Sequence, residues 1–132
     1  MSERLIDRIW DAFHERLGDD LRGVDLYSGE RLESRLRDDV RQLYSPAEDR
    51  EAADDTIVKQ LGLARTESAF KVGELRSLIR VFDEAYVLSW THELEEKSGV
   101  MVSVERPGET VTLADLEWCL EYLDDEITDL TE

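Results

Sequence analysis

Residues 74–92 read ELRSLIRVFDEAYVLSWTH, with an apolar-rich run on each side of Asp83-Glu84. Alternating side chains flanking a short polar link predict a β-hairpin. If Asp83 and Glu84 form the loop, Ile79 lies opposite Leu88, and alternate side chains of each strand share one face of a sheet. The first face is apolar and is expected to lie in the core. It consists of Leu75, Ile79, Val81, Tyr86, Leu88 and Trp90.

The second face of this hairpin mixes charged and apolar side chains, namely Arg76, Leu78, Arg80, Phe82, Val87, Ser89 and Thr91. Its apolar members need a cover, and the sequence allows two kinds. One is a helix of the same chain, with the arginines paired to carboxylates at its rim. The other is a protein partner, in which case the interface residues are Arg76, Leu78, Arg80, Phe82 and Val87.

Three further strands are expected on either side of this hairpin. Residues 21–27 and 31–36 flank Ser28-Gly29 and predict an earlier hairpin. Residues 100–105 follow the second hairpin, and their valines alternate with other residues. The chain therefore supplies five strands in the order two, then three.

Helical spacing of apolar residues places three helices between and around these strands. The first covers residues 5–17 and ends at Gly18. The second covers residues 46–61, with a capping box at its start and Gly62 expected as a left-handed stop. The third begins after Thr112. Residues 63–73 are consistent with either another helical turn or a loop with Phe70 tucked inward.

The resulting order is α-ββ-α-βββ-α. It predicts one α+β domain over residues 1–132, with frayed last residues and a mostly antiparallel five-stranded sheet flanked by helices. No linker or repeat divides the sequence.

The charge is strongly negative, with 33 acidic residues against 16 basic ones. An acidic docking surface is one explanation, and a cytoplasm with molar salt is the other, because self-repulsion is screened when the Debye length is about 3 Å. The acids are spread along the chain in pairs such as Asp19-Asp20 and Asp124-Asp125, which favours the salt explanation. Nucleic acid is not expected as a partner, since no basic cluster is present.

A cytoplasmic location is also expected from the single cysteine, Cys119, and from the lack of a long apolar segment. The sequence contains no phosphate-binding glycine loop, nucleophile elbow, HExxH or CxxC pattern, so no cofactor or metal is expected. His92 precedes Glu93 and is the one candidate for a histidine–carboxylate dyad. No nucleophile accompanies it.

Two resemblances add to this interpretation. The stretches 18–24 (GDDLRGV), 36–40 (LRDDV) leading to Tyr44, and the hairpin with Leu75-Arg76 and residues 79–83 (IRVFD) resemble a family of small acidic proteins of halophilic archaea without an assigned activity. The element order is similar to that of roadblock/longin and profilin-like domains. That resemblance implies a dimeric interaction module, at the level of fold only.

Three functions follow as hypotheses. The first is a non-enzymatic regulatory or scaffold module that acts through protein–protein contact, as a homodimer or with an unknown protein. The alternative is a PAS-like sensor that holds a small ligand near Tyr86, Trp90, His92 and Trp118. The third is an enzyme with a site centred on His92.

Overall fold

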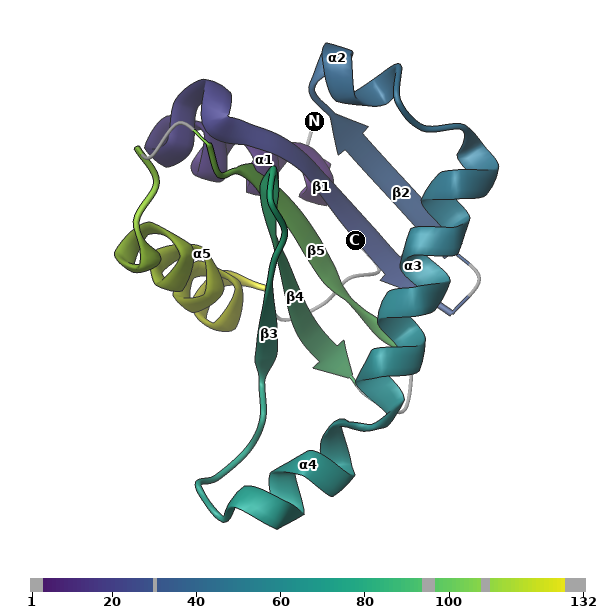
Figure 1. The fold of residues 1–132 in the computed structure, drawn as a ribbon, viewed down its shortest axis with the longest axis vertical. Helices are drawn as coiled ribbons and strands as arrows, with labels where there is room; N and C mark the ends of the chain where they lie inside the picture. The colour runs from purple at the N-terminus through teal and green to yellow at the C-terminus, as the bar shows by residue number, and fades with distance from the viewer. Residues whose placement is uncertain (1–3, 30, 94–96, 108–109, 128–132) are drawn as a thin grey trace.

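A computed structural model describes residues 4–29, 31–93, 97–107 and 110–127 of the protein. It has a five-stranded sheet with helices on both faces (Figure 1). The strands lie in the order β2-β1-β5-β4-β3, and all neighbours are antiparallel. The elements are α1 Leu5–Leu17, η1 Gly18–Asp20, β1 Leu21–Ser28, β2 Arg31–Leu36, α2 Asp38–Arg41, α3 Pro46–Leu61, α4 Leu63–Phe70, β3 Ser77–Val81, β4 Ala85–Glu93, β5 Ser98–Glu105 and α5 Leu113–Glu126. The predicted fold class is confirmed, and the expected fraying of the last residues falls outside the described part.

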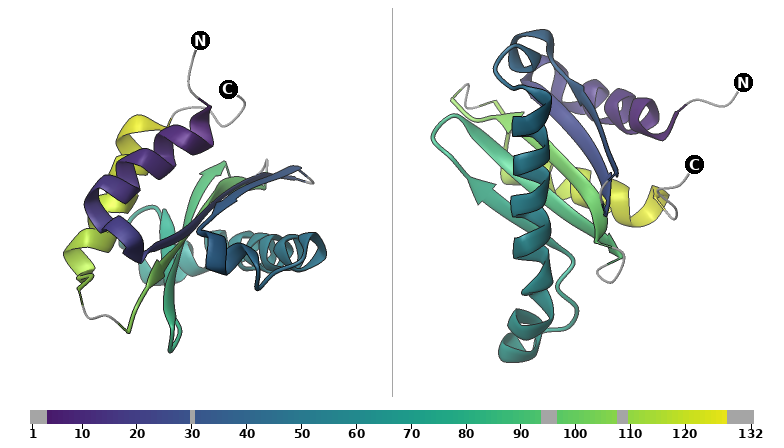
Figure 2. Two further views of the ribbon diagram at one scale, coloured as in Figure 1. Left: turned by 90° about the horizontal axis from the view of Figure 1, so that it is seen from above. Right: turned by 90° about the vertical axis from the view of Figure 1, so that its right-hand side faces the viewer.

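The two faces of the sheet are covered by different helices. Helices α1 and α5 lie together on one face of the sheet, and α3 crosses the other (Figure 2). The main core fills the first interface, where Phe13 of α1 and Leu123 of α5 are fully buried against Val100, Val102 and Val104 of β5. The alternating valines of β5 therefore share one face of the sheet, as the sequence predicted.

Local sequence signals set the helix ends. Ser45 accepts a hydrogen bond from the backbone N–H of Glu48, and the Glu48 carboxylate accepts one from Ser45. Thr112 and Asp115 form the same reciprocal pair at the start of α5. Both pairs satisfy backbone donors that have no partner inside the helix.

Helix α3 ends at Leu61 with Gly62 as its C-cap, as expected, but the left-handed conformation expected at Gly62 is wrong. Gly62 has φ −88° and ψ −5°, a right-handed conformation, and α4 begins at the next residue. The left-handed residue is Lys71, with φ 53°, at the end of α4. Residues 63–70 are therefore helical, and Phe70 is exposed rather than tucked inward.

The central hairpin has the predicted register. Ile79 pairs with Leu88 and Val81 with Tyr86, and the Phe82 N–H donates to the Ala85 carbonyl at 2.8 Å to close the loop around Asp83 and Glu84. The connection to β5 is shorter than expected, since β4 extends to Glu93 and β5 begins at Ser98.

The expected core face of this hairpin is only half buried. Leu88 and Trp90 of β4 belong to the main core, but Ile79 and Val81 of β3 are 40% and 59% exposed. The reason is the extent of the helical layer: α1 packs on β1 and β2 and α5 on β4, so β3 at the sheet edge is left uncovered.

Candidate functional site

Helix α3 covers the part of the mixed sheet face that holds Arg80, Val87 and Ser89. A second, smaller cluster lies beneath it, formed by Tyr27, Ile57 and Met101 with Leu32 and Val87 packed against them. Of the two covers that the sequence allowed for this face, a helix of the same chain is therefore present.

A buried polar pair fixes α3 to the sheet. The Tyr27 hydroxyl donates to Gln60 Oε1 at 2.6 Å, and Gln60 Nε2 donates to the Ser98 carbonyl at 3.1 Å. Burial raises the pKa of the Tyr27 phenol above its ordinary value, so the phenol stays protonated and donates. Because both groups are satisfied, this pair is a structural anchor.

Arg80 connects the edge strand β3 to α3. Its Nη2 donates to Thr56 Oγ1 at 2.9 Å and to Ser89 Oγ at 3.3 Å, and its Nη1 lies 3.1 Å from Asp55 Oδ2. Its Nε is buried and has no hydrogen-bond partner among the described residues. Arg80 is thus a half-buried cation, 25% exposed, whose buried Nε donor has no described partner.

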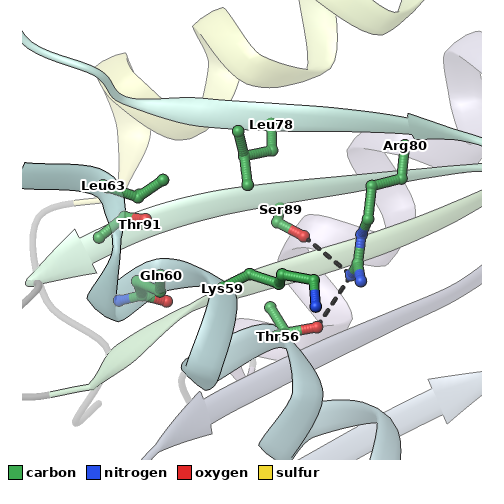
Figure 3. A pocket seen from close by; sticks show the side chains of 8 residues that line it. All are labelled: Thr56, Lys59, Gln60, Leu63, Leu78, Arg80, Ser89 and Thr91. Atoms are coloured by element: carbon green, nitrogen blue, oxygen red, sulfur yellow. Dashed lines mark hydrogen bonds between the residues drawn. The ribbon is translucent and has the colours of Figure 1, made fainter. Parts of the chain in front are cut away.

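A hollow of about 230 Å³, partly open to solvent, lies beside Arg80 between α3 and the β3–β4 hairpin (Figure 3). Its walls are polar along α3 and β4 and apolar at Leu63 of α4 and Leu78 of β3. They are formed by Thr56, Lys59, Gln60, Leu63, Leu78, Arg80, Ser89 and Thr91. That volume includes open solvent, and the enclosed part has room for about one water-sized group, so the hollow is too small for a metabolite.

The five residues expected at a partner interface lie in different surroundings in the structure. Leu78 and Arg80 line the hollow, and Val87 packs beneath α3. Phe82 lies in the hairpin turn and is 53% exposed. The set is therefore partly a cover for α3 and partly free surface.

Arg76 does not share the surroundings of Arg80. It precedes β3, its guanidinium lies 3.1 Å from Glu74, and a second nitrogen lies 3.9 Å from Asp124 of α5. Arg76 therefore pairs with α5, whereas Arg80 contacts α3 on the opposite face of the sheet.

The outer edge of β3 is a surface that sequence reasoning missed. Strand β3 is the last of the sheet and, among the described strands, pairs only with β4. The exposed side chains of Ile79, Val81 and Phe82 lie along it. Hydrophobic alternation predicted these positions, but only the strand order, a long-range property, reveals that β3 is at the edge.

The residues proposed for a sensor pocket lie on the other face. Tyr86 and Trp118 pack against the main core, and Trp90 is buried, with its Nε1 donating to Asp124 Oδ1 at 2.7 Å. The hollow beside Arg80 is separated from them by the sheet. The side chain of His92 lies outside the described residues, so the His92 dyad stays a prediction.

Asp25 is a half-buried acid that the sequence did not single out. It lies on β1 opposite Ser34 of β2. Burial raises its pKa to about 6, and Asp49 of α3 adds repulsion, while the Ser34 hydrogen bond and Arg41 act in the other direction. Cys119 is also buried, and burial raises its pKa to about 12, as expected for an inert core thiol.

A metal site and a membrane-spanning helix are two further possibilities for the described part of the chain. No group of three or more histidine, cysteine, aspartate or glutamate side chains there is placed to hold a metal ion. Nor does any described helix combine the length and apolar character needed to cross a lipid bilayer.

A solved structure defines the class of this fold. The crystal structure of a Roadblock/LC7 domain from Streptomyces avermitilis is similar, with a TM-score of 0.60 and 12% sequence identity. The alignment covers 96% of this chain and 100% of that chain. At this identity the likeness concerns the fold alone, and it confirms the roadblock-like architecture.

The family follows from the sequence itself. Residues 7–127 match DUF7522, a domain of unknown function, and the chain belongs to that family. No curated protein matches the sequence. The expected membership of a family without an assigned activity is confirmed, while a halophilic source stays a prediction.

Proposed function

We propose that the protein is a non-enzymatic scaffold or regulatory module of a high-salt cytoplasm, and that it works as a homodimer joined through strand β3. The observation that carries this proposal is the uncovered edge of β3, with Ile79, Val81 and Phe82 exposed beside it.

An open strand edge presents unpaired backbone donors and acceptors, and monomeric proteins usually protect such an edge with charge, proline or a bulge. Strand β3 has the sequence SLIRV, without proline, and its register with β4 is unbroken. Its one charged side chain, Arg80, is directed to α3. Within the described residues, no proline, bulge or outward-pointing charge therefore protects this edge.

A second copy of the chain fits this edge by symmetry. In an antiparallel pair centred on Ile79, Ile79 lies opposite Ile79 of the second copy, and Leu78 lies opposite Arg80. Centring the pair on Arg80 instead would place two like charges opposite each other, which is unfavourable. The Ile79-centred register joins two sheets into one and covers the exposed apolar side chains.

The proposal predicts the effect of a charge on this edge. Val81→Glu should convert a dimer to a folded monomer, because the new carboxylate would be buried against the second copy. Leu43→Glu is the matched control, since Leu43 is similarly exposed, at 64%, but follows β2 at the opposite side of the sheet. Light scattering coupled to size exclusion in molar KCl gives the masses.

Two results would contradict the homodimer. One is a monomeric mass for the wild-type protein across the concentration range. The other is a dimeric mass for both variants, which would place the contact elsewhere.

A further inference from the structure

We propose that the hollow between α3 and the β3–β4 hairpin binds one small monovalent anion of halide size, held by Arg80 and Lys59. This site is independent of the dimer, because its lining faces α3 and not the outer edge of β3.

Charge is the first argument. Lys59 runs along the hollow, and its ammonium group ends beside the Arg80 guanidinium (Figure 3). One carboxylate serves both cations: Asp55 lies 3.1 Å from Arg80 Nη1 and 3.6 Å from Lys59 Nζ. Two positive charges against one negative charge leave the site with an excess of one, and none of the described lining residues is an acid.

Hydrogen-bonding capacity is the second argument. Arg80 Nε is buried without a partner among the described residues, and buried donors in folded proteins are nearly always satisfied. The Ser89 hydroxyl accepts from Arg80 and retains its own proton to donate. Together with the Lys59 ammonium, these groups form a set of donors, which an anion matches and a cation does not.

The size of the hollow limits which anion can bind there. The hollow measures about 230 Å³ only with the open solvent at its mouth included, and its enclosed part has room for about one water-sized group. An ion bound there is therefore monatomic and sheds its waters on the protein side. The net charge of −17 repels anions at long range, so we expect binding at high ionic strength, where the Debye length falls to about 3 Å at 1 M.

The competing explanation is a water molecule that satisfies Arg80 Nε. A crystal grown with bromide in place of chloride separates the two by anomalous scattering. We expect a bromide peak within about 3.5 Å of Arg80 Nε, the range of a hydrogen bond. Ordinary water density without anomalous signal at that place would overturn the proposal.

The matched measurement in solution uses two lysine variants of the full chain. Lys59→Gln removes a charge from the hollow, and the Lys59 side chain is 57% exposed, so the variant is expected to fold. Lys71→Gln removes the same charge from an exposed site outside it. The melting temperature is followed as chloride replaces gluconate, an anion too large for the hollow, at constant potassium concentration.

A ligand that binds the folded state raises the melting temperature in a saturable manner. We expect such a rise for the wild type and Lys71→Gln, and a chloride midpoint at least tenfold higher for Lys59→Gln. Equal responses of the two variants would overturn the proposal. A bromide peak in the crystal combined with equal responses would mean binding at crystal concentration only, and it would overturn the proposal as well.

Discussion

Ionisation of Asp25 lowers the free energy of unfolding of the protein. This residue lies on β1 opposite Ser34 of β2, and burial raises its pKa to about 6 from 3.8. The folded protein therefore holds the proton more tightly than the unfolded chain. Asp25 contributes stability that is fully present below about pH 4 and is lost as the pH rises through about 6.

Asp25→Asn keeps the shape of the protonated acid and removes the charge. We expect it to raise the free energy of unfolding by about 2 kcal/mol at pH 7.5, from a shift of roughly two pKa units at about 1.4 kcal/mol each, reduced for partial exposure. The gain should vanish below about pH 4. Urea denaturation between pH 4 and 7.5 measures it, with the exposed Asp38→Asn as control. A gain that does not change with pH would contradict this assignment.

Sequence reasoning found the residues whose partners are near in the chain. Ser45 with Glu48 and Thr112 with Asp115 were readable because a helical turn fixes which residues meet. The bond between Tyr27 and Gln60 joins residues 33 apart, and nothing local marks it. Asp25 was missed for the same reason, since its burial depends on where α3 crosses the sheet.

The helices and strands were predicted better than the residues that pack between them. The register of β3 and β4 followed from a two-residue loop, which leaves one pairing that keeps the faces consistent. The buried side of α3 does not follow its apolar residues: Ala53 and Ile57 are buried, but Val58 is 65% exposed, and the polar Thr56 and Gln60 complete the buried side. Polar residues that hydrogen-bond across a layer do not appear in an apolar pattern.

The junction of α3 and α4 gives a test at this scale. At Gly62 the backbone is right-handed, and an added Cβ would meet only the Lys59 carbonyl, at 3.5 Å, an ordinary contact. We expect Gly62→Ala to stabilise the protein by about 0.4–1 kcal/mol, by lowering the entropy of the unfolded chain.

Gly18→Ala is the contrasting variant, because Gly18 has φ 61° at the end of α1. It should destabilise the protein by about 1 kcal/mol. Chemical denaturation compares the two. Destabilisation by Gly62→Ala of the same size would indicate the left-handed conformation that the sequence suggested and would contradict the right-handed backbone at Gly62.

The whole molecule has two layers of different character on one sheet. The face under α1 and α5 is a dry core, whereas the face under α3 combines a small apolar cluster with Arg80, the Tyr27–Gln60 pair and the hollow. Neither layer covers β3 fully, so the sheet ends in an apolar edge. The order of elements predicted the sheet, but the open edge depends on which strands the helices cover.

Oxidative cross-linking of Ile79→Cys tests the pairing of two β3 edges at a single pair of atoms. Opposed side chains in an antiparallel pair have Cβ atoms about 4.5–5.5 Å apart, close enough for a disulfide after a small adjustment. The native Cys119 is buried and stays unreactive. We predict a covalent dimer for Ile79→Cys under mild oxidation at micromolar protein and none for Leu43→Cys. Failure of Ile79→Cys to cross-link, or equal cross-linking of both variants, would contradict a homodimer centred on β3.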